Sequence, residues 1–280
     1  MSWIDPPRSA VREVVTRALA EDLGVLGDLT AGLVPDDAVA RAAFVCRGEG
    51  VLAGRLCAIE TFAAVDPAVV VDWRIPDGVE LRPGDVIAVV EGSLGSILTA
   101  ERTALNLLGR LSGVATLTRR YVHAAQGLAR IRDTRKTTPG LRALEKAAVR
   151  AGGGANHRGS LSDGLLVKDN HLAGLSITEA VQRAKRRWPG HPVEVECDTA
   201  AQVNEAVAAG ADMVLLDNMT PDAVASCVKL VGGRAAVEVS GGVTLETVPH
   251  YAAAGVDFIS VGALTHSAPA VDIGLDLQEA

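Results

Sequence analysis

Apolar residues near the start of the chain recur with the period of a helix. After the Pro6-Pro7 break they stand at i, i+3, i+4, i+7 and i+8, at Val11, Val14, Val15, Ala18 and Leu19. This spacing places them on one face of an amphipathic helix. A second helical pattern covers 97–111 and leaves Glu101, Arg102 and Asn106 toward another surface.

Between these two patterns, from about 38 to 91, the apolar residues form short β-branched runs. The runs are 42–46, 69–73 and 86–90, and turns rich in Gly, Pro and Asp separate them, including Pro76-Asp-Gly78. We therefore expect a small sheet with helices on it, followed by a domain boundary near 112–116.

From residue 130 the chain repeats one unit: a short strand, a polar residue at its end, and a helix. The strand candidates are 130–134, 164–167, 193–196, 213–216, 235–239 and 257–261. Caps punctuate the helices between them, with Asp198 or Thr199 before one, and Thr220 with Pro221 before another that Gly232 closes. This repetition predicts a parallel α/β sheet of six or seven strands, fewer than a regular eightfold barrel has.

Polar residues or glycine end the later strands at a regular interval. They are Lys168, Glu196, Asp217, Ser240 and Gly262, separated by 28, 21, 23 and 22 residues. Parallel strands place such residues on one rim of a barrel, where barrel enzymes keep their active sites.

Composition and charge narrow the class of protein. The chain has 280 residues, 48% of them hydrophobic, and a net charge of −7. An acidic chain with 3% aromatic residues lacks the broad basic face and stacking platforms of a nucleic-acid binder. Yet the segment 130–168 carries nine Lys or Arg against three Asp or Glu, which indicates a pocket for a small anion.

The four cysteines show no metal-ligand spacing, and we interpret Cys46, Cys57, Cys197 and Cys227 as reduced core thiols. The first residues lack the basic and apolar regions of a signal peptide, and no run of about 18 apolar residues occurs. We expect a cytoplasmic protein.

Basic residues near strand ends are the candidates for anion binding. They are Arg135, Lys136, His157, Arg158 and Lys168, a mixture that suits carboxylates and phosphates. Arg142, Lys146 and Arg150, spaced by four on one helix, are instead interpreted as a solvated helix surface.

Two carboxylates and two glycine turns complete the predicted rim. Glu196 and Asp217 are oxygen ligands of the kind Mg²⁺ prefers, although acid/base or structural roles remain alternatives. Glu194 shares a side with Glu196, and the strand end favours the latter. The turns after the last two strands, with Ser240, Gly241 and Gly262, suit phosphate, and His266 is a candidate donor to it.

Several motifs, in order and nearly end to end, resemble the quinolinate phosphoribosyltransferase family. They are Thr134-Arg-Lys-Thr137, Gly152-Gly-Gly-Ala-Asn-His-Arg158, Lys168-Asp-Asn-His171, Leu216-Asp-Asn218, Ser240-Gly-Gly242, Glu101-Arg-Thr-Ala-Leu-Asn106 and Gly262-Ala-Leu-Thr-His266. One departure is Ala147, where the family often has Tyr, which calls the local packing into question.

The resemblance implies a fold and an assembly. It implies an N-terminal open α/β sandwich over 1–114, joined by 268–280, packed on an incomplete α/β barrel over 115–267. It also implies a homodimer in which Arg102 reaches the partner subunit's site.

The resemblance further implies transfer of the phosphoribosyl group of phosphoribosyl pyrophosphate to quinolinate with decarboxylation. Quinolinate would be bound by Arg135, His157, Arg158 and Lys168, with Arg102 from the partner subunit. Lys136 would lie between the two substrates, Glu196 and Asp217 near the ribose and Mg²⁺-pyrophosphate, and the 5′-phosphate would be held by Ser240, Gly241, Gly262 and His266.

Three alternatives remain open at this stage. A paralogous phosphoribosyltransferase of the molybdenum-transport-associated type would have a different acceptor. A barrel aldolase would form a Schiff base on Lys168, and a non-catalytic phosphosugar-binding protein would need the anion contacts without the pair Glu196 and Asp217.

Overall fold

The computed structural model describes residues 4–278. The predicted N-terminal domain also includes Met1–Trp3 and Glu279–Ala280, which lie outside the described residues. The chain forms two compact units. The first comprises Met1–Arg119, Thr137–Gly153 and Leu264–Ala280, and the second Arg120–Lys136 and Gly154–Ala263. The domain limits given above remain a prediction.

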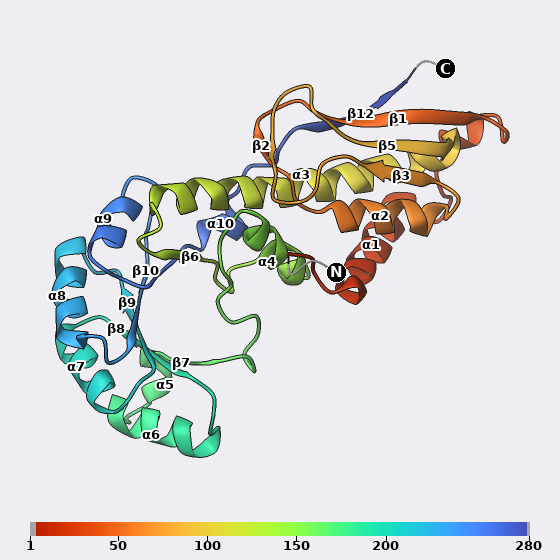
Figure 1. Ribbon diagram of the computed structural model, residues 1–280. Coiled ribbons are helices and arrows are strands. Elements are labelled where there is room, and N and C mark those ends of the chain that lie inside the picture. Colours follow the sequence, from red (N-terminus) through yellow and green to blue (C-terminus); the bar gives the residue numbers. More distant parts are fainter. Residues whose placement is uncertain (1–3, 279–280) are drawn as a thin grey trace. The chain divides into compact units, whose positions relative to one another are not determined.

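The first unit contains an antiparallel sheet of four strands in the order β12-β1-β5-β3 (Figure 1). Its elements are α1 (Arg8–Leu23), η1 (Ala31–Leu33), β1 (Val39–Cys46), β2 (Gly50–Val51), α2 (Arg55–Val65), β3 (Val70–Trp73), β4 (Glu80–Leu81), β5 (Val86–Ser93), α4 (Arg142–Ala151) and β12 (Ile273–Leu277). The last strand of the chain thus pairs with the first, Ala42 lying opposite Leu277. The predicted first helix and small sheet are confirmed.

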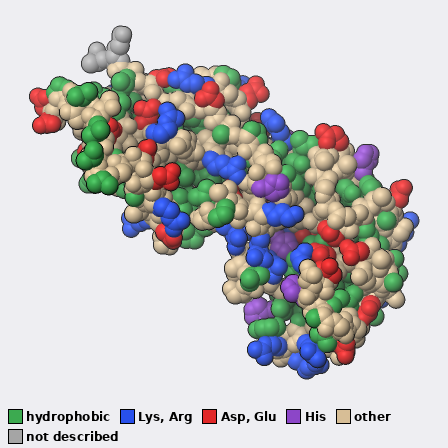
Figure 2. Space-filling model, turned by 180° about the vertical axis from the view of Figure 1, so that it is seen from behind, with side chains coloured by type: hydrophobic (Ala, Val, Ile, Leu, Met, Phe, Trp, Pro, Cys, Tyr) green, Lys and Arg blue, Asp and Glu red, His purple; other side chains and the backbone are tan. Residues whose placement is uncertain are grey.

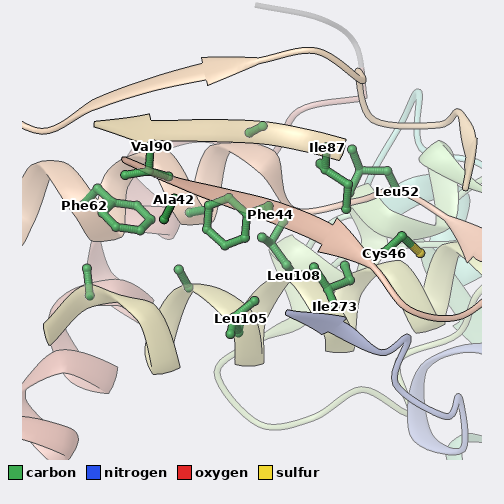
Figure 3. Packing of buried hydrophobic residues seen from close by; sticks show 14 of the residues in the cluster. Ala42, Phe44, Cys46, Leu52, Phe62, Ile87, Val90, Leu105, Leu108 and Ile273 are labelled. Carbon is green, nitrogen blue, oxygen red and sulfur yellow. The ribbon is translucent and has the colours of Figure 1, made fainter. Parts of the chain in front are cut away.

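The core of this unit lies between the sheet and the helices α2 and α3, the latter spanning Leu94–Ala124 (Figure 3). Phe44 of β1 meets Phe62 of α2 edge to face, with ring centroids 5.9 Å apart. Leu105 and Leu108 of α3 pack against the same cluster, which Ile273 of β12 also joins. Burial of Ile273 in this cluster and the pairing of β12 with β1 together hold the C-terminal strand to the N-terminal sheet.

Helix α3 (Leu94–Ala124) runs without a break through the point where the sequence suggested a boundary. Gly113 stands inside it, and a Cβ there would lie 2.0 Å from the backbone oxygen of Pro269. The glycine therefore permits close approach of the C-terminal segment to the helix, and it does not end the helix.

The second unit is a parallel sheet of six strands in the order β6-β11-β10-β9-β8-β7. Its elements are β6 (Arg130–Arg132), β7 (Leu165–Val167), α5 (Asp169–Leu172), α6 (Ile177–Arg187), β8 (Val193–Cys197), α7 (Ala200–Ala208), β9 (Met213–Asp217), α8 (Pro221–Val231), β10 (Ala236–Ser240), α9 (Val248–Ala253) and β11 (Phe258–Ser260), with α10 (Ala263–His266) at the unit boundary. All six strand candidates are confirmed, and with them the α/β fold class.

The helices α6 to α9 lie outside the six strands (Figure 1). The caps of α7 and α8 are those that the sequence predicted. Thr199 accepts a hydrogen bond from the backbone N–H of Gln202, and Thr220 accepts one from Ala223 ahead of a helix with Pro221 at its first position. Gly232 closes α8 in the left-handed conformation.

One prediction about α4 is wrong. Its basic residues were expected on a solvated surface, but Lys146 is buried, and Arg150 donates to the backbone oxygens of Ile4 and Asp5. Ala147 is buried as well, and only a cavity of about 10 Å³ lies beside it. The small side chain is therefore accommodated by close packing.

All four cysteines are free and buried, as predicted. Burial raises the pKa of Cys57 and of Cys197 to about 12, so neither thiol ionises near neutral pH. Among the described residues, none of the helices combines the length and apolar character that crossing a bilayer requires.

We predict that Gly113→Ala lowers the free energy of unfolding by about 1–3 kcal/mol, because the added methyl group clashes with Pro269. Gly95→Ala, at a position in the same helix whose nearest atoms are 3.9 Å away, should leave stability unchanged or slightly raised. Thermal unfolding of both variants tests this, and equal melting temperatures would contradict the proposed close approach.

Candidate active site

The carboxyl ends of the parallel strands place the predicted rim residues in order around the second unit. Lys168 follows β7, Glu196 and Asp217 stand at the ends of β8 and β9, Ser240 ends β10, and Gly262 follows β11. The register sets Asp217 directly beside Ser240 on the neighbouring strand. The parallel arrangement therefore brings these residues to one edge, as the spacing predicted.

Lys168 and Glu196, from the neighbouring strands β7 and β8, form an ion pair through Nζ and Oε2. The pair is partly solvated, with side-chain exposures of 39% and 15%. The pair stands at the carboxyl ends of β7 and β8, where a ligand could reach it. A second anion near Lys168 would compete with Glu196 for the ammonium group.

The turn after Asp217 packs tightly on the turn after Ser240. Asn218, with φ of 53°, donates from its backbone N–H to the Ser240 oxygen at 3.0 Å and from its side chain to Asp217 Oδ2 at 2.7 Å. A Cβ on Gly241 would lie 2.2 Å from the Asn218 side chain, and its φ is +92°. Glycine is thus required there by both space and backbone conformation.

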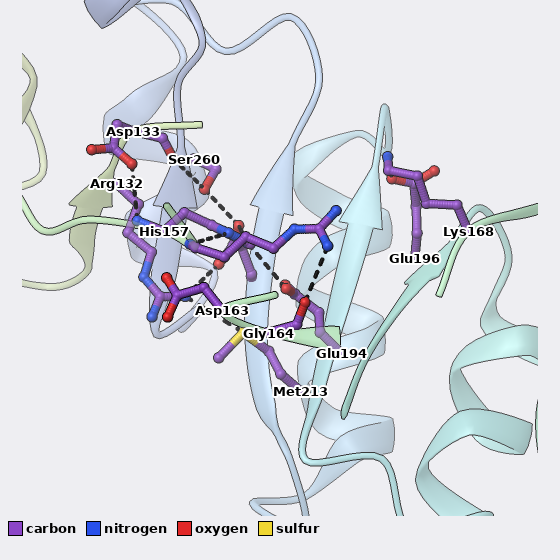
Figure 4. A network of polar contacts seen from close by, with 12 residues as sticks. Arg132, Asp133, His157, Asp163, Gly164, Lys168, Glu194, Glu196, Met213 and Ser260 are labelled. Carbon is purple, nitrogen blue, oxygen red and sulfur yellow. Dashed lines mark hydrogen bonds and ion pairs between the residues drawn. The ribbon is translucent and has the colours of Figure 1, made fainter. Parts of the chain in front are cut away.

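A network of charged and polar side chains lies on the buried face of the parallel sheet (Figure 4). His157 Nε2 lies 3.0 Å from Glu194 Oε2 and 3.4 Å from Glu238 Oε1. Arg132 donates to Glu238 Oε2 at 2.7 Å, and the Ser260 hydroxyl donates to Oε1 at 2.5 Å. Glu238 is fully buried, so these contacts compensate for the loss of its hydration.

Burial raises the pKa of Glu238, and the charge of Glu194 raises it further, whereas His157, Ser260 and Arg132 lower it. Desolvation outweighs the favourable partners. Glu238 therefore retains its proton to a higher pH than an exposed carboxylate does.

His157, Glu194 and Glu238 have the spacing of a metal site, since their ligand atoms all lie within 4.8 Å of one another. The hydrogen bonding argues against metal at this place. The backbone N–H of Arg158 donates to His157 Nδ1 at 2.7 Å, so the neutral ring carries its proton on Nε2 and donates it to the glutamates. An Nε2 that bears a proton offers no lone pair to a metal ion.

Asp133, fully buried at the end of β6, fixes the segment that carries His157. Its carboxylate accepts from the backbone N–H of His157 at 2.9 Å and from the Asn156 side chain at 2.5 Å. The backbone of Ala155 meanwhile bridges to Arg132 in parallel fashion. The segment after the triple glycine is thereby aligned along the edge strand.

Arg158 contacts the backbone that leads into β7. Its guanidinium donates to the Gly164 oxygen at 3.1 Å, just before β7 begins, whereas Lys168 follows the end of that strand. Partial burial lowers the pKa of Arg158, the charge of Arg135 lowers it further, and Glu194 raises it.

A cavity of about 300 Å³ opens beside Arg158. Arg132 and Arg158 line it together with Asp163 and Glu194, so its charges are mixed. Acidic and basic side chains are also interspersed on the face shown in Figure 2, with histidines among them.

The remaining candidates are Lys136, Arg102 and His266. Lys136 is exposed, and its backbone N–H donates to Thr134 at 3.0 Å. Arg102 is exposed on α3 and His266 on α10, where Nδ1 lies 2.6 Å from the Ser267 hydroxyl. Both belong to the first unit.

The interior residues Asp133, Glu238 and Ser260 were missed by the sequence reasoning. A signal was present, because central parallel strands are normally apolar and β8 and β10 carry Glu at inward positions.

A six-stranded parallel α/β sheet with a Lys–Glu pair and a carboxylate on its carboxyl rim defines an enzyme-like barrel of the α/β class. Comparison with known proteins identifies the group within that class. The sequence matches the C-terminal domain of quinolinate phosphoribosyl transferase over residues 114–276 and its N-terminal domain over residues 28–112. The chain belongs to the quinolinate phosphoribosyltransferase family.

Individual relatives agree with this membership. The chain is 44% identical to a Bacillus subtilis protein named as a probable nicotinate-nucleotide pyrophosphorylase (carboxylating), over 95% of this chain and 93% of that one. It is 43% identical to the nicotinate-nucleotide pyrophosphorylase (carboxylating) of Mycobacterium leprae, covering 96% and 97%. The solved nicotinate-nucleotide pyrophosphorylase from Francisella tularensis superposes with a TM-score of 0.93 at 39% identity, over 98% of each chain.

We predict that the raised pKa of Glu238 makes stability depend on pH. Between the ordinary Glu pKa, roughly 4.3, and the raised value, the folded chain keeps a proton that the unfolded chain has lost. The contribution of Glu238 to the free energy of unfolding therefore falls as pH rises.

Denaturant unfolding of the wild type and of Glu238→Gln from pH 4 to 7.5 measures this. The stability of the wild type minus that of the variant should decrease with pH, by at most about 1.4 kcal/mol per pH unit. A difference in stability that stays constant, or grows with pH, would show that the pKa of the Glu238 carboxyl group is not raised.

Proposed function

We propose that this protein transfers the phosphoribosyl group of phosphoribosyl pyrophosphate to quinolinate, with decarboxylation, and yields nicotinate mononucleotide, pyrophosphate and CO₂. This is a pentosyl transfer in NAD biosynthesis. Membership of the family over both of its domains carries the proposal. The ordered rim of Lys168, Glu196, Asp217 and Ser240 supports it. Four free, buried cysteines agree with a reducing compartment, the cytoplasm.

In this proposal the basic side chains divide between two substrates. Arg135, Arg158 and Lys168, with Arg102 from the partner subunit of a homodimer, bind the two carboxylates of quinolinate. His157 belongs to the same pocket. Since both its ring nitrogens have protein partners, it acts by holding the backbone of Arg158.

Phosphoribosyl pyrophosphate lies along the rest of the rim. Lys136 stands between the two substrates, and Ser240, Gly241, Gly262 and His266 hold the 5′-phosphate. Backbone N–H groups at a glycine turn suit that phosphate. The tight packing of Gly241 on Asn218 would keep this turn in a fixed position beside Asp217.

Glu196 and Asp217 fit the Mg²⁺ that this chemistry calls for. Their carboxylates stand at the ends of neighbouring strands and are partly exposed, and each uses one oxygen for a protein partner, Lys168 or Asn218. The other oxygen of each is of the type that Mg²⁺ prefers. Bound there, Mg²⁺ would neutralise charge on the pyrophosphate leaving group.

The proposed reaction forms two bonds, from the ring nitrogen to C1 of the ribose and from a ring carbon to a proton, and it breaks two. The pyridine nitrogen attacks C1 of the ribose while the bond from C1 to the pyrophosphate oxygen breaks, through an oxocarbenium-like state that Glu196 or Asp217 stabilises. The ring nitrogen becomes cationic. It then accepts electron density as the bond to the adjacent 2-carboxylate breaks, CO₂ leaves, and the ring carbon takes a proton.

Orientation is the main task left to the protein, because the cationic ring supplies the electron sink. Holding the 3-carboxylate with Arg and Lys keeps the reacting group aligned. The ion pair with Glu196 engages Lys168 Nζ, the atom that a Schiff base would need, and so argues against the aldolase alternative.

Purified protein with phosphoribosyl pyrophosphate and Mg²⁺, offered quinolinate or nicotinate separately, tests the function. We expect CO₂ and nicotinate mononucleotide from quinolinate alone. Turnover of nicotinate would instead favour a paralogous transferase, and binding of both substrates without turnover would favour a non-catalytic sensor.

We predict that Lys136→Ala and Arg158→Ala each lower turnover at least about a hundredfold, as loss of a preorganised charge-stabilising donor typically does. Steady-state kinetics on quinolinate measures this. Near-wild-type kinetics in either variant would remove that residue from the site.

For Arg102 we predict complementation between subunits. Arg102→Ala and Lys168→Ala should each be inactive, and mixing the two should restore part of the activity, because a hybrid dimer carries one intact site. Subunit exchange is confirmed with a tagged subunit. Full exchange without any recovery would exclude a site shared between subunits.

A further inference from the structure

A buried ion pair in the first unit ties together two segments of the chain that adjoin proposed substrate contacts. Glu145 of α4 is fully buried, and Arg110 of α3 donates to its Oε1 from Nη2 at 2.8 Å and from Nε at 3.3 Å. A carboxylate without access to water needs such partners.

The first tied segment is the loop between β6 and α4. Thr138 donates to Glu145 twice, from its backbone N–H to Oε2 at 3.0 Å and from its hydroxyl to Oε1 at 2.8 Å. Thr138 follows Lys136 by two residues in the chain. The position of Glu145 therefore fixes the end of the loop that carries Lys136.

The second tied segment leaves α10. Arg110 donates from Nη2 to the backbone oxygen of Thr265 and from Nη1 to that of Ala268 at 3.0 Å. Thr265 directly precedes His266. The guanidinium of Arg110 on α3 thus connects the carboxylate of Glu145 on α4 with the backbone on either side of His266, at the end of α10. These three helices are labelled in Figure 1.

We propose that Arg110 and Glu145 are positioning residues for phosphoribosyl pyrophosphate, which hold Lys136 and His266 through the backbone of their loops. This inference rests on the proposed function. Neither side chain contacts the substrate in this account. Their effect appears in substrate affinity because a shifted loop misplaces its cationic donor.

Glu145→Gln is the informative variant, because it keeps size and shape. Both carboxylate oxygens accept from N–H donors, Oε1 from Arg110 and Oε2 from Thr138. Either orientation of the amide therefore sets an NH₂ group against one of these donors and loses that hydrogen bond. Loss of a charged hydrogen bond of this kind should raise the KM for phosphoribosyl pyrophosphate about tenfold.

Glu60→Gln is the matched control. Glu60 is likewise a buried glutamate of the first unit, paired with Arg8 and Arg12, and it contacts neither loop. We expect it to lower the melting temperature while leaving both KM values unchanged. The KM for quinolinate should also stay within about twofold in Glu145→Gln, which separates positioning from general loss of structure.

Thr138→Val and Thr138→Ser keep the inference testable if Glu145→Gln does not fold. Valine removes the hydroxyl and should raise the same KM about threefold, whereas serine retains the bond and should restore it. An active wild type with unchanged KM for phosphoribosyl pyrophosphate in Glu145→Gln, or in Thr138→Val, overturns the inference. An inactive wild type overturns the proposed function, and this inference with it.

Discussion

The cost of burying carboxylates inside the parallel sheet governs the arrangement of the second unit. Glu238 and Asp133 are fully buried, and Glu194 nearly so. Each needs a donor close at hand, and a buried charge left without its partner costs roughly 3–5 kcal/mol. Arg132 and Ser260 donate hydrogen bonds to Glu238, and the backbone N–H of His157 donates one to Asp133. Satisfying these groups fixes which side chains face inward.

The same constraint determines what His157 is able to do. A ring that accepts from Arg158 at Nδ1 and faces two glutamates at Nε2 has its tautomer and orientation set from both sides. The histidine therefore connects the backbone of Arg158 with Glu194 of β8 and Glu238 of β10. Fixed in this way, His157 holds the backbone N–H of Arg158. The Arg158 guanidinium stands at the end of a long side chain and reaches the Gly164 oxygen.

The sequence predicted the strands and their rim well because both depend on local, periodic features. Apolar runs, caps such as Thr220 with Pro221, and the spacing of strand ends follow from the chain itself. The interior network could not be predicted in this way. His157, Glu194 and Glu238 meet only because β8 and β10 both flank β9, and the sheet order is a long-range property. Likewise, the period of α4 showed that Lys146 shares a face with Arg150, yet it could not show which face is covered.

Under the proposed function, the ion pair at the rim would link substrate binding to the charge available for catalysis. In the structure Lys168 neutralises Glu196. Under the proposed function, a quinolinate carboxylate that binds Lys168 competes for this ammonium and weakens its hold on Glu196. The freed carboxylate then faces the ribose, where positive charge develops, and Coulomb attraction at ~4 Å rises from about 1 kcal/mol in water to about 4 at an effective dielectric of 20. Binding of the acceptor thus prepares the group that stabilises the transition state, so that bond cleavage in phosphoribosyl pyrophosphate is favoured only when the acceptor is present.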